Sequence, residues 1–268
     1  MTRFDGSRHR IDRALMHAQT FTEKANALIQ GNPPEFAFDF KHDGNMGGIG
    51  TVRAIFAKPF DRTLALELGE FFYQLRAALD GAFWEASVIL AGGKAPAKPN
   101  GFEFPICPTK EKFNSGPVHK LPFPKKLYEL ICSIQPYRVS EYADTHEARF
   151  INIVKLLHDC ARFDRHRELS VMAAFPAAGK ATLYSTQPYQ FTHVQILRAN
   201  FLEDECHFLG FQIDGWDGVA EPDVALQGHL DIEVSVKEIP RALNLGDSLE
   251  ELRVTTAYIV EEFAKAFP

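Results

Sequence analysis

The sequence predicts an α+β protein in which a helical bundle carries an antiparallel β-sheet, with a β-hairpin near the N-terminus. Residues 64–90 repeat apolar side chains at the three- and four-residue spacing of one helical face. Residues 224–236 instead alternate apolar and polar side chains, as does a strand with one buried face. The 268 residues suffice to bury a sizeable core. These three observations together favour the α+β class.

Composition limits the kinds of function that the chain can have. The net charge of −6 gives no general attraction to phosphate backbones, so a role in coating nucleic acid is unexpected. The 23 phenylalanines indicate a Phe-rich core. Cys107, Cys132, Cys160 and Cys206 form no close pair, which argues against a zinc ribbon or a disulfide scaffold. With no apolar run near the roughly 20 residues of a membrane span, a cytoplasmic protein without a membrane partner is expected.

The N-terminal part should form one helix and one hairpin. Residues 8–30 are amphipathic, and Gly31 followed by two prolines ends the helical pattern. Phenylalanines then alternate with polar residues over 36–40, and an extended pattern resumes over 49–60. The glycine-rich stretch between them lacks the Gly-Lys-Ser/Thr ending of a phosphate loop and precedes a strand, so a hairpin connection is favoured.

The remaining elements follow the long helix at 64–90. Residues 101–108 suggest a short strand broken by prolines, residues 127–134 a short helix, and residues 145–162 a second long helix. Residues 191–201 and 206–213 resemble a hairpin within a sheet of three to five strands. Ser248 opens a capping-box pattern, Ser-Leu-Glu-Glu, that predicts the start of a C-terminal helix.

We therefore expect a single domain over residues 1–268. Its helical core would comprise about 8–30, 61–168 and 247–268. Its β elements would lie at about 35–60 and 169–240.

Two groups of residues could carry chemistry. Arg76, Asp80 and Trp84 follow one another at four-residue steps along the margin of the apolar face of the long helix. Residues 164–167, Asp-Arg-His-Arg, place a carboxylate, an imidazole and two guanidiniums at the end of the second long helix. Taken alone, the first group could be an ordinary helix ion pair and the second a basic helix end. Together they have the parts of a phosphate-binding or phosphodiester-cleaving site.

Four segments of the chain resemble a family of bacterial proteins of unknown function. The segments are LGEFFYQLRAALDGAFW, FEFPI, ICSIQPYR and LLHDCARFDRHREL, within about residues 68–170. The family shows Leu-Arg-x-x-Leu-Asp-His on a helix, then Phe-Pro-Ile, Gln-Pro-Tyr and Asp-Lys-His-Arg. Its helix motif places an arginine before a histidine and thereby looks like the signature of the HEPN superfamily (higher eukaryotes and prokaryotes nucleotide-binding), whose helical domains often act as metal-independent ribonucleases.

The resemblance assigns roles to residues of this chain. It implies a HEPN-like bundle in which Arg76 and Arg167 hold a phosphate, His166 is general acid or base, and Asp80 or Asp164 orients it. Gln135 and Tyr137 of the Gln-Pro-Tyr motif, Arg165 and Trp84 would contact the substrate. The chain departs from the family at one position, because Gly81 stands where the helix histidine is expected.

The functional hypotheses follow from this resemblance. The first is a metal-independent ribonuclease or nucleotide-binding protein, with RNA or a nucleotide as partner, no cofactor and no metal, and a homodimer allowed. The alternative is a non-catalytic partner- or ligand-binding protein in which the same residues form a structural network. The second alternative is a metal-dependent phosphohydrolase that uses His146, His158, Asp159 and Asp164.

Overall fold

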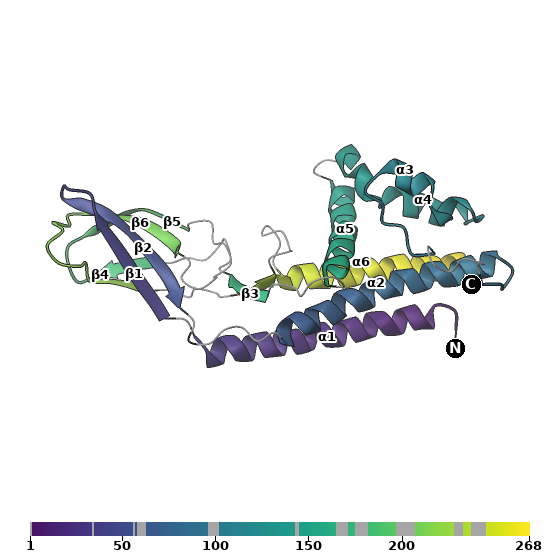
Figure 1. The fold of residues 1–268 in the computed structure, drawn as a ribbon, viewed down its shortest axis with the longest axis horizontal. Helices are drawn as coiled ribbons and strands as arrows, with labels where there is room; N and C mark the ends of the chain where they lie inside the picture. The colour runs from purple at the N-terminus through teal and green to yellow at the C-terminus, as the bar shows by residue number, and fades with distance from the viewer. Residues whose placement is uncertain are drawn as a thin grey trace. The chain divides into compact units, whose positions relative to one another are not determined.

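The computed structural model confirms the α+β class (Figure 1). It describes residues 2–33, 35–55, 57, 63–95, 102–142, 145–164, 171–174, 182–196, 207–227, 233–236 and 245–268. Contacts divide the chain into two compact units. The helical unit comprises residues 1–22, 63–169 and 238–268, and the β unit comprises residues 23–62 and 170–237.

Long helices with apolar faces build the helical unit. In chain order the helices are α1 (Asp5–Gly31), which contributes residues to both units, α2 (Thr63–Leu90), α3 (Lys110–Asn114), α4 (Lys125–Ser133), α5 (His146–Asp164) and α6 (Leu245–Ala266), with 3-10 turns η1 (Pro117–His119) and η2 (Pro136–Tyr142). Helix α2 buries the predicted stripe, including Leu68, Leu75 and Ala82, at no measurable exposure. It packs against α5 and α6.

Phenylalanines from distant segments fill the centre of this unit. The rings of Phe83 on α2 and Phe263 on α6 meet edge to face, and Phe104 contacts both. Phe4 packs on Phe263 from the N-terminus. The Phe-rich core expected from composition is therefore confirmed in this part of the chain.

Helix α6 begins earlier than the sequence predicts. It starts at Leu245, so Ser248 lies buried within its first turns rather than at the N-cap. Helix α5 crosses α2 and α6 (Figure 1), and these three helices pack against one another.

A four-stranded antiparallel sheet organises the β unit, in the order β1-β2-β6-β5. Its strands are β1 (Glu35–His42), β2 (Gly47–Ile55), β5 (Gln190–Ile196) and β6 (His207–Asp214). Two short pairs accompany it: β4 (Thr182–Ser185) with β7 (Val224–Gln227), and β3 (Val171–Ala174) with β8 (Glu233–Val236). The single strand expected over 224–236 is thus wrong, since β7 and β8 belong to different sheets.

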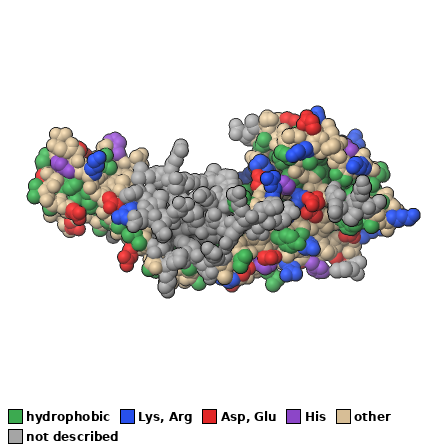
Figure 2. Space-filling model, viewed as in Figure 1, with side chains coloured by type: hydrophobic (Ala, Val, Ile, Leu, Met, Phe, Trp, Pro, Cys, Tyr) green, Lys and Arg blue, Asp and Glu red, His purple; other side chains and the backbone are tan. Residues whose placement is uncertain are grey.

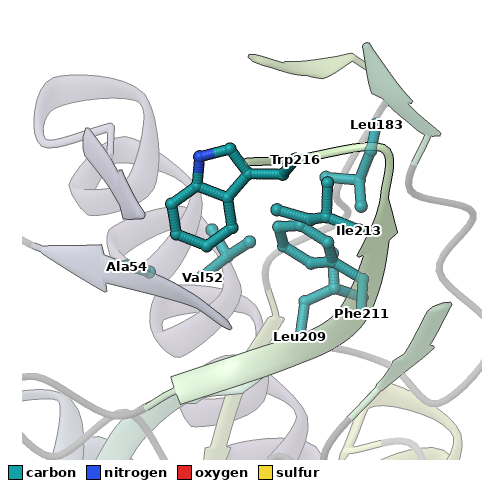
Figure 3. Close-up of a cluster of buried hydrophobic side chains, with 7 residues drawn as sticks. All are labelled: Val52, Ala54, Leu183, Leu209, Phe211, Ile213 and Trp216. Atoms are coloured by element: carbon teal, nitrogen blue, oxygen red, sulfur yellow. The ribbon is translucent and has the colours of Figure 1, made fainter. Parts of the chain in front are cut away.

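A cluster of buried apolar side chains packs around this sheet (Figure 3). It comprises Val52, Ala54, Leu183, Leu209, Phe211, Ile213 and Trp216, all buried. Strand β1 packs phenylalanines against it, and β2 contributes Val52 and Ala54. Gly50 of β2 is required, because a Cβ at this position would lie 2.2 Å from Cζ of Phe211. The far end of the Phe211 ring thus occupies the space that a side chain at position 50 would need.

Candidate functional site

Residues 102–107, here called the strap, organise the region around the predicted site. The sequence favours a short strand here, but the strap is in no sheet. Prolines 105 and 108 remove the amide hydrogens that a sheet ladder would need. Side chains of α2 and of the α4–η2 junction bind the strap backbone instead, while Phe104 and Ile106 are buried.

Arg76 and Asp80 both bind residue 104 of the strap. Nη2 of Arg76 donates to the carbonyl oxygen of Phe104 at 2.8 Å, and the amide of Phe104 donates to Oδ1 of Asp80 at 2.8 Å. Nη2 of Arg76 also lies 2.8 Å from Oδ1 of Asp80. Arg76 is only 5% exposed, whereas its spacing in the sequence placed it at the margin of the apolar face. The pair therefore binds both the amide and the carbonyl oxygen of Phe104.

Trp84 and Gln135 extend this arrangement along the strap. The ring of Trp84 contacts Phe102 edge to face, with centroids 6.2 Å apart. Gln135 is fully buried, and its Nε2 donates to the carbonyl oxygens of Pro105 at 2.9 Å and Ile131 at 2.8 Å. Its Oε1 accepts from the amide of Cys107 at 3.0 Å. Four expected site residues thus share one partner, which is the strap: Arg76, Asp80, Trp84 and Gln135.

Tyr137 lies elsewhere, beside aromatic side chains of α3 and η1. Its ring packs on Phe113, which in turn contacts His119. Burial is the main cause that raises the pKa of the Tyr137 hydroxyl, and burial likewise raises the pKa of the Cys107 thiol. Both groups are therefore protonated near neutral pH, which does not suit a base or a nucleophile.

Two nitrogen atoms of the Arg76 guanidinium make no hydrogen bond to the described residues. Its Nε and Nη1 atoms are buried and have no hydrogen-bond partner among the described residues. A carboxylate oxygen of Glu103 lies 3.8 Å from Nη2, so two acids face this one cation. Two neighbouring carboxylates make the site unfavourable for a further anion such as phosphate.

Gly81, at the position where the resembled motif would have a histidine, faces α1. A Cβ at this position would lie 3.0 Å from Oγ of Ser7, and Ser7 is buried. The N-terminal part of α1 therefore approaches α2 closely at the position where the motif expects an imidazole. A larger side chain would require Ser7 or α1 to move.

The second predicted group cannot be placed beside Arg76. Asp164 is the last residue of α5, and Arg165, His166 and Arg167 lie outside the described residues. Of the alternative metal ligands, Asp159 pairs with Lys155 at 2.6 Å. Within the described ranges, no group of three or more His, Cys, Asp or Glu side chains could hold a metal ion.

A cavity of about 550 Å³ opens between α4, η2, α5 and α6 of the helical unit. Apolar side chains form most of its wall, and acidic side chains lie among them. The lining residues are Leu130, Ser133, Ile134, Tyr142, His146, Glu147, Arg149, Phe150, Ile151, Ile153, Glu250, Glu251, Val254, Thr255 and Tyr258. The volume falls within the range of small-molecule sites. Local sequence patterns do not reveal this cavity, because its walls come from segments that lie far apart in the chain.

The surface of the described residues gives two further observations. On the face shown in Figure 2, basic and acidic side chains are interspersed over the helical unit instead of forming one basic patch. None of the helices in the described ranges combines the length and the apolar character that crossing a membrane requires.

Comparison of the chain with protein-family models, with curated proteins and with solved structures gives no match.

Proposed function

We propose that the chain is a non-catalytic ligand-binding protein. In this proposal Arg76, Asp80, Trp84 and Gln135 form a structural network, and an apolar small molecule occupies the cavity between α4, α5 and α6. The observation that carries the proposal is that Arg76 binds the carbonyl oxygen of Phe104 while Asp80 binds its amide. A phosphate ligand would have to compete with that carbonyl oxygen and with Asp80.

Thermal unfolding tests the structural role of this network. Arg76→Ala leaves the Phe104 carbonyl oxygen and the half-buried Asp80 carboxylate without their cation. We expect the free energy of unfolding to fall by about 3 kcal/mol, because removing one partner of a buried ion pair leaves the other buried without its opposite charge. For a domain of this size the melting temperature should fall by ~10 °C.

Lys155→Ala is the matched control. Lys155 and Asp159 form an ion pair at the same four-residue helical spacing, but both side chains are about half exposed. Such pairs contribute less than about 1 kcal/mol, so the melting temperature should change little. Equal effects of the two substitutions would contradict a structural role for Arg76.

A second candidate function, metal-independent RNA cleavage, draws on the two unpartnered N–H groups of Arg76. It requires His166 to replace the missing helix histidine as general acid or base. Purified protein would then release cyclic-phosphate ends from RNA, and His166→Ala would abolish this release without lowering the melting temperature. That result would overturn the non-catalytic proposal.

A further inference from the structure

The cavity has an apolar interior with aromatic walls. Phe150 on α5 and Tyr258 on α6 stand nearly perpendicular to each other, with ring centroids 5.9 Å apart and an interplanar angle of 87°. Tyr142 lines the cavity from η2. Both residues line the cavity, and the negative face of an aromatic ring attracts a cation.

One of these rings already binds a cation within the protein. The guanidinium carbon of Arg138 lies 5.3 Å from the centroid of the Tyr142 ring. Nη2 of Arg138 also donates to the Tyr142 hydroxyl at 2.9 Å. Arg138 does not line the cavity. Tyr142 therefore already makes a cation–π contact with a guanidinium of the chain itself.

The charges that line the cavity are mostly negative. The described lining residues include three carboxylates, those of Glu147, Glu250 and Glu251, and one guanidinium, that of Arg149. Arg149 pairs with Glu251. Glu250 binds Arg253 outside the cavity, and this hydrogen bond is the main cause that lowers the pKa of Glu250.

Glu147 is the carboxylate that remains without an ion-pair partner among the described residues. Its own backbone amide and then the Thr145 hydroxyl lower its pKa, so it is ionised near neutral pH. Among the described residues, no lysine lines the cavity. An anionic ligand would therefore meet a negative field with no free cation to bind it.

We propose that this cavity binds a small organic cation, an amine or quaternary ammonium compound with an apolar body, an inference that rests on the proposed ligand-binding function. The apolar body fills the interior between Leu130, Ile134 and Ile153. The cationic group lies against the rings of Phe150 and Tyr258, within reach of the field of Glu147 and Glu250.

Three ligands of equal chain length test the charge preference. Isothermal titration of the full chain with octyltrimethylammonium, octanol and octanoate compares a cation, a neutral alcohol and an anion. We expect the cation to bind at least tenfold more tightly than octanol, and octanoate to bind most weakly. Tighter binding of octanol or octanoate would overturn the cation proposal and leave the ligand-binding function in place. Binding of none of the three would overturn both.

Two substitutions locate the binding. Tyr258→Leu removes the aromatic face but keeps an apolar side chain, so the affinity for the cation should fall about tenfold while that for octanol changes little. Tyr73→Leu is the matched control, because Tyr73 on α2 has the same 47% exposure and does not line the cavity. Equal losses of cation binding in both variants would overturn the assignment to this cavity.

Discussion

Gln135 is a polar side chain whose surroundings no local sequence pattern reveals. The Gln-Pro-Tyr motif suggested a residue that contacts substrate. In the structure its amide group is fully buried and makes three hydrogen bonds to backbone atoms of the strap and of α4. An amide suits this position because it supplies two donors and one acceptor to three backbone groups.

Gln135→Glu tests the buried hydrogen bonds of this amide. The new carboxylate would face the carbonyl oxygens of Pro105 and Ile131, which both need a donor. The charged form is disfavoured in the folded state, so the pKa of the new group should rise above its unfolded value of about 4.3. Because the folded state then binds more protons than the unfolded state, stability should fall as pH rises, by up to about 1.4 kcal/mol per pH unit.

Urea unfolding between pH 5 and 8 measures this dependence. Gln135→Met is the matched control, since it removes the same hydrogen bonds without adding a titrating group. Its loss of stability relative to the parent chain should stay constant over this range. If the stability of Gln135→Glu also ran parallel to that of the parent chain, the buried contacts of Gln135 would be contradicted.

At the scale of elements, periodicity predicted the helices well because each helix satisfies its own backbone. The stripe on α2 depends only on local spacing, and it is buried as expected. The strap and the strands depend on distant partners. Arg76 reaches a carbonyl oxygen 28 residues later, and no local pattern encodes that contact. Likewise, the alternation over 224–236 is equally satisfied by one strand or by two strands in separate sheets.

Strand β2 depends on its glycines, and Gly50 offers the sharpest test. Its missing side chain makes room for Phe211, so the added methyl group of Gly50→Ala would overlap the ring. We expect this overpacking to lower the free energy of unfolding by about 1–3 kcal/mol. Gly6→Ala on α1 is the control, because nothing lies within 4 Å of a Cβ there, and a helix gains up to about 1 kcal/mol from alanine. Chemical denaturation that showed no difference between the two variants would contradict the close approach at Gly50.

At the scale of the whole molecule, the proposed function belongs to one of the two units. The strap network and the cavity both lie within the helical unit. The β unit has its own apolar cluster around Phe211 and Trp216. Two separate cores favour two units that unfold independently, each responding to substitutions in its own core.

The two tryptophans allow this independence to be measured. Trp84 lies in the helical unit against Phe102, and Trp216 lies in the β unit, where its Nε1 donates to the carbonyl oxygen of Ala220 at 2.6 Å. In a Trp216→Phe background, fluorescence during urea unfolding reports on the helical unit alone. A Trp84→Phe background reports on the β unit in the same way.

We expect Arg76→Ala to lower the midpoint of the Trp84 signal and leave that of Trp216 in place. Gly50→Ala should do the reverse, because each substitution disturbs the packing of one unit only. The two substitutions serve as controls for each other, since each is expected to be silent at the other tryptophan. If either substitution moved both midpoints equally, the two cores would unfold as one cooperative structure, and ligand binding in the helical cavity would then stabilise the β unit as well.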